Sequence, residues 1–159
     1  MDFRLNEEQS QFQHSVRGIA ERHLKDDAAT RALDPRYPWD VARLLAEHGL
    51  LGITTPESDG GQGGCLMDAI IAIEEVALAC PRSADVVQAG NFGPIRTLSE
   101  YGTPEQKARF LPKLLAGETL IAIAMTETEA GSAVTDLKTE ATPDGDGYRI
   151  QGSKVFTTH

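Results

Sequence analysis

Residues 101–132 read YGTPEQKARFLPKLLAGETLIAIAMTETEAGS, and this stretch contains the change that decides the fold. Its first half is helical, since Thr103 can cap a helix and Gln106, three residues later, completes a capping box. Gly117 is a typical helix stop. The apolar run over residues 119–126 lies between polar turns and predicts a buried strand. The sequence therefore predicts helices before this run and strands from it onward.

Upstream of this stretch, apolar residues recur at helical spacing. Phe12, Val16 and Ala20 lie on one face of a 3.6-residue period, and Asn6 with Gln9 can form the cap of that helix. The segment 66–80 is apolar almost all round, which predicts a helix buried between others. Further helices are predicted from Pro38 to Gly49, over 84–101 with a bend or break at Gly93-Pro94, and over 103–117 with a kink at Pro112.

Downstream, the sequence predicts short strands. Candidate strands cover residues 137–142, 148–151 and 155–158, and Asp144-Gly145-Asp146-Gly147 is a hairpin signal between the first two. The predicted fold class is mainly α with a β segment. A helical domain over 1–118 is followed by the incomplete beginning of a β domain over 119–159. Since the last strand would leave an unpaired edge, the 159 residues are expected to belong to a longer chain.

Composition excludes several classes of partner. The net charge is −9 and no run exceeds two adjacent basic residues, so a nucleic-acid partner is not expected. No apolar stretch is long enough to span a membrane. The first residues lack a secretory signal pattern, which predicts a cytoplasmic protein. Cys65 and Cys80 form no CxxC motif and are predicted to be free thiols, and the four histidines show no zinc-ligand spacing.

Two candidate motifs are weak, and a third is more informative. The Gly-rich loop 60–64 lacks the spacing of a P-loop or dinucleotide fingerprint and is predicted to be a turn between helices. Glu127 and Glu129 could suggest an acid–base pair, but two glutamates in a turn are weak evidence. Residues 124–132 leave the predicted strand and enter a Gly/Ser turn. Such a turn offers hydroxyl and backbone N–H donors to a polar ring or a phosphate.

Four segments, in the same order, resemble the acyl-CoA dehydrogenase family. They are PWDVARLLAEHGLLGITTPESDGGQGG (38–64), YGTPEQKARFLPKLLAGE (101–118), AMTETEAGS (124–132) and DGDGYRIQGSKVFTTH (144–159). The resemblance covers essentially the whole chain. It implies a helical domain, a middle β domain and a second helical domain, with FAD as cofactor. The implied reaction is α,β-dehydrogenation of an acyl-CoA thioester, with an electron-accepting flavoprotein as partner and a dimer or tetramer as the assembly.

The resemblance also implies a cofactor site. Thr126 would meet the pyrimidine edge of the flavin, Phe156 would stack near the isoalloxazine, and Thr158 would hydrogen-bond near N5. Ser132 would lie beside both the flavin and the CoA part of the substrate. The full set implied to bind the cofactor is Ile123, Ala124, Met125, Thr126, Gly131, Ser132, Phe156, Thr157 and Thr158. The family's catalytic glutamate lies far downstream, so no catalytic residue is assigned in this chain.

The sequence departs from the family pattern at several of these positions. Thr128 stands for the usual Pro of the signature, Ala133 for its Asp, Asp136 for a small residue, Phe156 for Trp and His159 for Asn. Two alternatives to the dehydrogenase remain open. One is a truncated, non-catalytic relative that binds an acyl group or a partner, and the other is a member resembling flavin monooxygenases or nitroalkane oxidases. A glutamate base downstream would favour the dehydrogenase.

Overall fold

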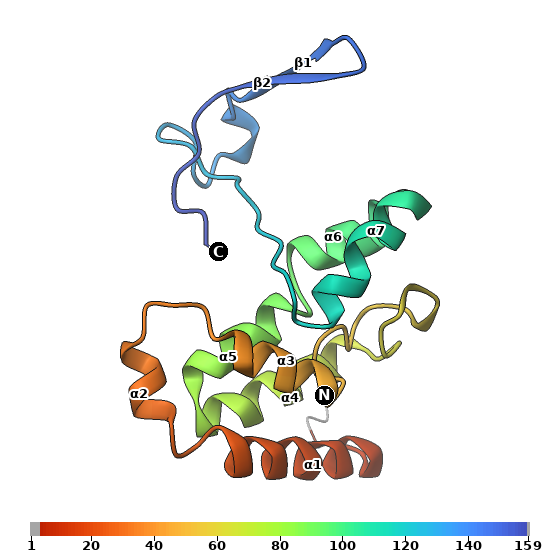
Figure 1. The fold of residues 1–159 in the computed structure, drawn as a ribbon, viewed down its shortest axis with the longest axis vertical. Coiled ribbons are helices and arrows are strands. Elements are labelled where there is room, and N and C mark those ends of the chain that lie inside the picture. Colours follow the sequence, from red (N-terminus) through yellow and green to blue (C-terminus); the bar gives the residue numbers. More distant parts are fainter. Residues whose placement is uncertain (1–3, 159) are drawn as a thin grey trace. The chain divides into compact units, whose positions relative to one another are not determined.

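The computed structural model describes residues 4–158, which form two compact units (Figure 1). The first, called here the helical unit, is Met1–Ile121, and the second, the hairpin unit, is Ala122–His159. Residues 4–158 are mostly helical with one two-stranded sheet, which confirms the predicted fold class. The domain division at residues 118 and 119 stays a prediction.

The helical unit contains seven α-helices among the described residues. They are α1 (Glu7–His23), α2 (Ala28–Leu33), α3 (Trp39–Glu47), α4 (Leu66–Ala79), α5 (Pro81–Ala89), α6 (Pro94–Tyr101) and α7 (Pro104–Leu115), with a 3-10 turn, η1, at Glu57–Asp59. The predicted break before Pro94 is present, since it separates α5 from α6. Helix α2 was not predicted, because its six residues bury none of their side chains and no side chain caps it.

Local capping explains where the best-predicted helices begin. The Asn6 side chain accepts from the Gln9 amide at 2.8 Å, and the Gln9 side chain accepts from the Asn6 amide at 3.1 Å. Thr103 and Gln106 repeat this reciprocal box at the start of α7. Each box pairs amides that a helix start would otherwise leave without partners. Pro112 lies inside α7, which continues past it to Leu115.

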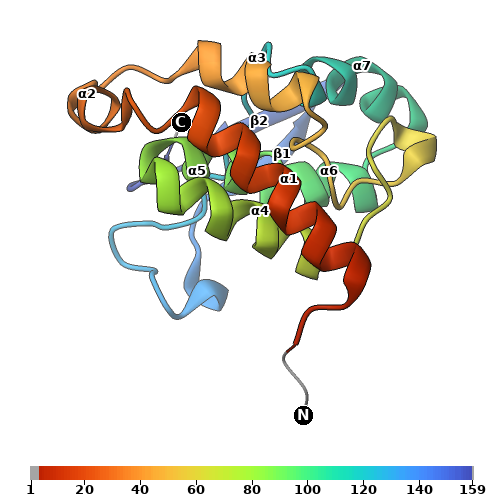
Figure 2. The same cartoon turned by 90° about the horizontal axis from the view of Figure 1, so that it is seen from below.

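The main core lies where α4 packs against α1 and α5, and Figure 2 shows α1 running alongside α4. Glu75 of α4 is 3% exposed and accepts two hydrogen bonds from Arg17 of α1, at 2.7 and 2.8 Å. This pairing lets a carboxylate stay charged within the core. Helix α4 thus lies between other helices, as predicted, although Leu66, Met67 and Ile70 on its outer face are exposed. Among the described elements, the close packing partners of α4 are α1 and α5.

The Gly-rich loop is an interhelical turn between α3 and α4, as predicted. Gly60 and Gly63 have φ of +88° and +66°, in the left-handed region that glycine adopts without strain. Gly61 is needed for a different reason. A Cβ at that position would lie 2.6 Å from the carbonyl carbon of Thr55 and closer still to its oxygen. Glycine is therefore required at Gly60 and Gly63 by the left-handed backbone, and at Gly61 by the close approach of the Thr55 backbone.

The hairpin unit contains β1 (Glu140–Asp144) and β2 (Gly147–Gln151), paired antiparallel with Glu140 opposite Gln151 and Asp144 opposite Gly147. Gly145, with φ of +62°, makes the predicted two-residue turn between them. The only helical element described in this unit is a 3-10 turn, η2, at Val134–Asp136. The strand predicted at 137–142 is β1, which starts later than expected, at Glu140. The strand predicted at 148–151 is confirmed as β2.

Two predicted strands are wrong. Residues 119–126 form no strand, and none of them is buried, with Ile123 and Met125 54% and 47% exposed. An apolar run becomes a strand only when another strand pairs with it, and β1 and β2 pair only with each other among the described residues. Residues 155–158 form no strand either, because Phe156 has a left-handed φ of +57° that interrupts an extended backbone.

Three further observations concern the chemistry of residues 4–158. No helix in this range combines the length and apolar character needed to cross a membrane. The described His, Cys, Asp and Glu side chains form no group of three or more that could hold a metal ion. Cys65, which is exposed, and Cys80, which is buried, are both free, as the sequence predicts.

Candidate functional site

Two segments implicated by sequence are joined inside the hairpin unit. The amide of Val155 donates to the carbonyl oxygen of Thr126 at 2.9 Å. One residue earlier, the Lys154 ammonium donates to the carbonyl oxygen of Met125, also at 2.9 Å. The two hydrogen bonds hold the chain just before Phe156 against Met125 and Thr126, at the start of the motif over residues 124–132. Segments about 30 residues apart in sequence thus become neighbours.

Glu127 is the centre of this arrangement. Its Oε1 atom accepts from the Lys154 ammonium at 2.8 Å, from the Thr139 amide at 3.0 Å and from the Thr139 hydroxyl at 2.5 Å. Its Oε2 atom accepts from the Lys138 amide at 2.7 Å. The carboxylate is 9% exposed and the ammonium 22% exposed. The chain has brought three separate segments together on one carboxylate.

These donors set the charge state of Glu127. The hydrogen bond from Lys154, followed by those from Thr139 and Lys138, lowers the pKa of Glu127 from its usual 4.5 to about 2. The group is therefore a carboxylate at neutral pH, with its oxygens engaged as acceptors. The acid–base role suggested by the pair Glu127 and Glu129 does not fit this geometry. Glu129 is 72% exposed and forms an ion pair with Lys138 instead.

A tight turn follows Glu127. The Glu127 amide donates to the carbonyl oxygen of Ala130 at 3.0 Å, and the Ala130 amide donates to the carbonyl oxygen of Glu127 at 3.2 Å. Ala130 is 1% exposed, so its methyl group anchors the turn. Gly131 has open space where a Cβ would be, and Gly131 and Ser132 are both exposed. The turn thus presents backbone and hydroxyl groups on a fixed base.

Phe156 has two unusual properties. Its side chain is 91% exposed, and it is the one residue other than glycine with positive φ among the described residues. A left-handed backbone at a bulky side chain costs about 1–2 kcal/mol. Strain of this kind is typical of functional positions, where the surrounding contacts hold it in place. The neighbouring bonds at Lys154 and Val155 are such contacts.

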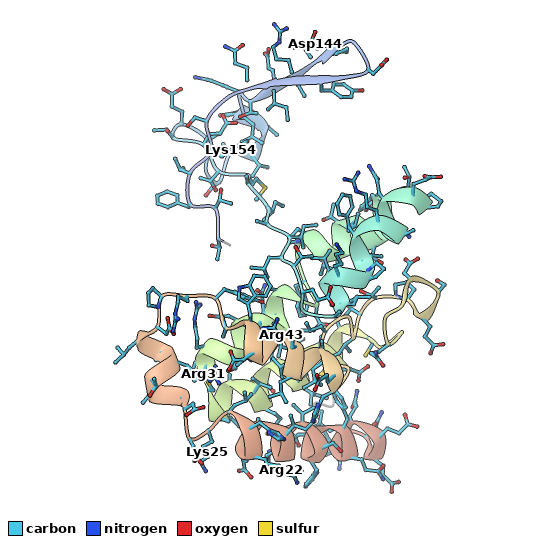
Figure 3. The ribbon with its side chains drawn as sticks, in the orientation of Figure 1. Arg22, Lys25, Arg31, Arg43, Asp144 and Lys154 are labelled. Carbon is cyan, nitrogen blue, oxygen red and sulfur yellow. The ribbon has the colours of Figure 1, made fainter. Side chains whose placement is uncertain are left out.

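The remaining predicted site residues lie on the surface of the same unit. Ile123, Ala124, Thr157 and Thr158 are exposed, and Thr126 is half-buried. The structure brings Met125 and Thr126 directly against the segment that leads into Phe156. His159 lies outside the described residues. Figure 3 shows Lys154 within the hairpin unit and Asp144 near the hairpin turn, where Asp144 pairs with Arg149 at 2.7 Å.

Sequence reasoning missed Lys154, Lys138 and Thr139. The one available signal was the sequence Gly152-Ser153-Lys154 just before the Phe156 segment, because a lysine between two apolar-patterned stretches needs an acceptor. The approach of Gly152 to Thr139 could not be read from the sequence. A Cβ at Gly152 would lie 2.7 Å from the Cβ of Thr139.

A cavity of about 470 Å³ lies in the helical unit, beside α2 and the start of α3. It is lined by charged side chains, including Arg31, Arg36 and Arg82, and by the edge-to-face pair Tyr37 and Trp39. Among the described residues each of these arginines already has an aspartate partner, at 2.7 Å for Arg31 and Arg36 and 3.7 Å for Arg82. The cavity therefore offers no unmatched arginine charge to a ligand.

Comparison with known proteins adds the family. Residues 6–118 match the model of the acyl-CoA dehydrogenase N-terminal domain. The chain belongs to the acyl-CoA dehydrogenase family. The residues matched by the family model are those of the helices that precede the candidate site. The relatives described next are similar over nearly the whole chain, including the candidate site.

Two curated relatives and one solved structure are similar to this chain over nearly its whole length. The chain is 37% identical over 154 residues to 3-sulfinopropanoyl-CoA desulfinase from Variovorax paradoxus, covering 97% of this chain and 38% of the relative. It is 35% identical over 159 residues to the short-chain-specific acyl-CoA dehydrogenase of Clostridium acetobutylicum, covering 100% of this chain and 42% of the relative. The structure of the FAD complex of PigA matches with a TM-score of 0.88 and 26% identity, over 99% of this chain and 42% of that one. The chain thus spans about two fifths of the length of these relatives.

Proposed function

We propose that this chain supplies the helical domain and the first part of the flavin site of an FAD-dependent acyl-CoA dehydrogenase. In this proposal the helical domain is residues 1–118, and the β domain begins at residue 119. The cofactor contacts are those implied by the resemblance, namely Ile123, Ala124, Met125, Thr126, Gly131, Ser132, Phe156, Thr157 and Thr158. The catalytic base is contributed by the part of the protein outside these residues.

One observation supports the proposal above the others. The two segments proposed to touch the flavin are hydrogen-bonded to each other through Val155, Lys154, Thr126 and Met125. A ring system as large as the isoalloxazine needs contacts from more than one segment held at a constant spacing. One solved neighbour, the FAD complex of PigA, has a similar fold over 99% of this chain.

The side chains present suit a flavin. Thr126, Ser132 and Thr158 offer hydroxyl donors, and the exposed turn at Gly131 leaves its backbone open to a close approach. Phe156 offers an exposed aromatic face with a strained backbone. Bound FAD would supply hydride acceptance from the β-carbon of the thioester. The residues of this chain would orient the ring and, through Ser132, the neighbouring part of the CoA substrate.

Partners and substrate follow the same reasoning. Both curated relatives are named for an acyl-CoA compound, so an acyl-CoA thioester is the proposed substrate class. An electron-accepting flavoprotein is the proposed redox partner, and a homodimer or homotetramer is the proposed assembly. The relative from Variovorax paradoxus is named as a desulfinase, which favours a second candidate, cleavage of a sulfinate group from an acyl-CoA.

The test uses the full-length protein. We expect it to purify with bound flavin, and we expect a short-chain acyl-CoA to bleach the flavin absorbance under anaerobic conditions. Thr126→Ala should slow this reduction about tenfold, because a hydrogen bond of this kind contributes about 1–1.5 kcal/mol. Thr142→Ala is the matched control, since that hydroxyl donates within the hairpin, to the carbonyl oxygen of Arg149 at 3.4 Å. Sulfite release from 3-sulfinopropanoyl-CoA without bleaching would favour the desulfinase. Unchanged kinetics in Thr126→Ala would contradict the assigned contact.

A further inference from the structure

We propose that the Glu127–Lys154 ion pair is a positioning device that sets the spacing between the two flavin-contacting segments. This inference rests on the proposed function and deepens it. Neither residue is among those proposed to touch the cofactor. Both act through the backbone of their neighbours, Met125 and Thr126 on one side and Phe156 on the other.

The first step of the argument is the double contact made by Lys154. Its ammonium group donates to the Glu127 carboxylate at 2.8 Å and to the Met125 carbonyl oxygen at 2.9 Å. One backbone bond from Val155 to Thr126 could act as a hinge. The ammonium bridge on the adjacent residue adds two further points of attachment, so rotation about that bond is restricted. The side chain is only 22% exposed, which reduces competition from water.

The second step is the way Glu127 extends the attachment to a third segment. Its carboxylate also accepts from the Lys138 amide at 2.7 Å and the Thr139 amide at 3.0 Å, immediately before β1. Hydrogen bonds from backbone amides fix the position of the main chain rather than that of one side chain. The hairpin base, the Thr126 segment and the Lys154 segment are therefore held together by the same two oxygen atoms.

The third step is that charge and acceptor capacity are both required. Four donors face the carboxylate, and an ionised carboxylate accepts at every lone pair and donates nothing. A glutamine has nearly the same shape, but its NH₂ group would face a donor at one of the two oxygen positions. Glu127→Gln should therefore disturb the arrangement without leaving a hole.

A nearby ion pair provides the matched comparison. Lys138 and Glu129 are 73% and 72% exposed, in the same unit, and Glu129 is two residues from Glu127. Exposed pairs contribute little, because water and salt screen them. If only the net charge of this region mattered, Glu129→Gln and Glu127→Gln would change FAD affinity by similar amounts. The positioning role predicts that they differ.

The experiment measures FAD affinity in the full-length protein after removal and re-addition of the cofactor. Glu127→Gln and Lys154→Met should each weaken FAD binding about tenfold, the loss expected for one hydrogen bond to a charged group. The double variant should bind FAD about as weakly as the weaker single variant, because both lose the same pair. Lys154→Arg should stay within about threefold of wild type, and Glu129→Gln should match wild type. Bound flavin should also show an altered absorbance spectrum in the two single variants.

Hydrogen exchange of the apo protein is the second readout. The amides of Lys138, Thr139 and Val155 should exchange faster in Glu127→Gln and Lys154→Met than in wild type or Glu129→Gln. Weaker binding together with faster exchange at these amides supports the proposal. Wild-type FAD affinity and spectrum in both single variants would overturn the proposal and leave the proposed function standing. A wild-type protein that binds no FAD would overturn the proposed function and the positioning role with it.

Discussion

The substitution Gly61→Ala tests how the Gly-rich loop is built. A Cβ at Gly61 would lie 2.6 Å from the carbonyl carbon of Thr55, and real Cβ atoms essentially never approach backbone so closely. The obstacle is main chain, so it cannot rotate away as a side-chain end could. Thr55 is 1% exposed, and its carbonyl oxygen accepts from the Gly63 amide at 2.9 Å. Relief of the clash must move this carbonyl group and break that bond.

The expected cost follows from these contacts. Loss of a hydrogen bond that leaves a buried carbonyl without a partner costs about 1–3 kcal/mol. Displacement of a packed backbone adds about 1–3 kcal/mol, as in overpacked cores. Gly61→Ala should therefore lower the free energy of unfolding by about 3 kcal/mol. Gly60→Ala should cost about 1–2 kcal/mol, because φ is +88° but the nearest atom, a methyl carbon of Leu115, lies at an ordinary 3.6 Å.

Urea unfolding of the full-length variants, followed by helical circular dichroism, measures these differences. Gly18→Ala is the control, because a Cβ on this exposed residue of α1 would meet no atom within 4 Å and should stabilise the helix by about 0.5–1 kcal/mol. The informative result is the order. If Gly60→Ala is more destabilising than Gly61→Ala, left-handed backbone rather than close approach dominates in this loop, and the reasoning is refuted.

Two further predictions concern the hairpin unit. Gly152→Ala should push Thr139 away from Glu127 and weaken FAD binding of the full-length protein several-fold. Gly147→Ala is the control, because a Cβ there would meet no atom within 4 Å and FAD affinity should not change. Equal FAD affinities of the two variants would contradict the close approach of Gly152 to Thr139. The pKa of Glu127 is lowered from 4.5 to about 2, first by its hydrogen bond with Lys154, so its stabilisation is complete above about pH 4.5 and is lost as the pH falls toward 2. Amide exchange at Thr139, corrected for its intrinsic pH dependence, should therefore lose protection over this range in wild type but not in Glu127→Gln.

The parts of the fold that sequence predicted well are those decided by neighbours in the chain. The capping boxes at Asn6 and Thr103 act over three residues, and the turn at Gly145 needs only its own backbone freedom. The strand predicted at 119–126 failed because a strand depends on a partner elsewhere in the chain. The left-handed backbone of Phe156 could not be predicted, since local preference for a bulky aromatic residue opposes it.

The candidate site shows the same division between local and distant effects. The resemblance supplied the segments around Thr126 and Phe156, and the Gly/Ser turn at residues 131 and 132 independently indicated open donors. Lys154 and Thr139 could not be recognised, because what matters is their distance to Glu127, which lies 27 and 12 residues away in the chain. Spacing that large carries no period that a sequence pattern could reveal.

Glu127 illustrates why the type of a residue is insufficient to assign its role. A general base must gain a proton during the reaction, so it needs an oxygen that is not already occupied and a pKa near the working pH. Glu127 has four donors on its two oxygens and a pKa of about 2, so neither condition is met. The same features suit the opposite task, since a carboxylate that stays ionised can hold backbone amides and an ammonium group in one arrangement throughout a reaction. In the positioning role proposed above, Glu127 acts by keeping its charge, and the proton transfer of the proposed reaction is assigned to another group.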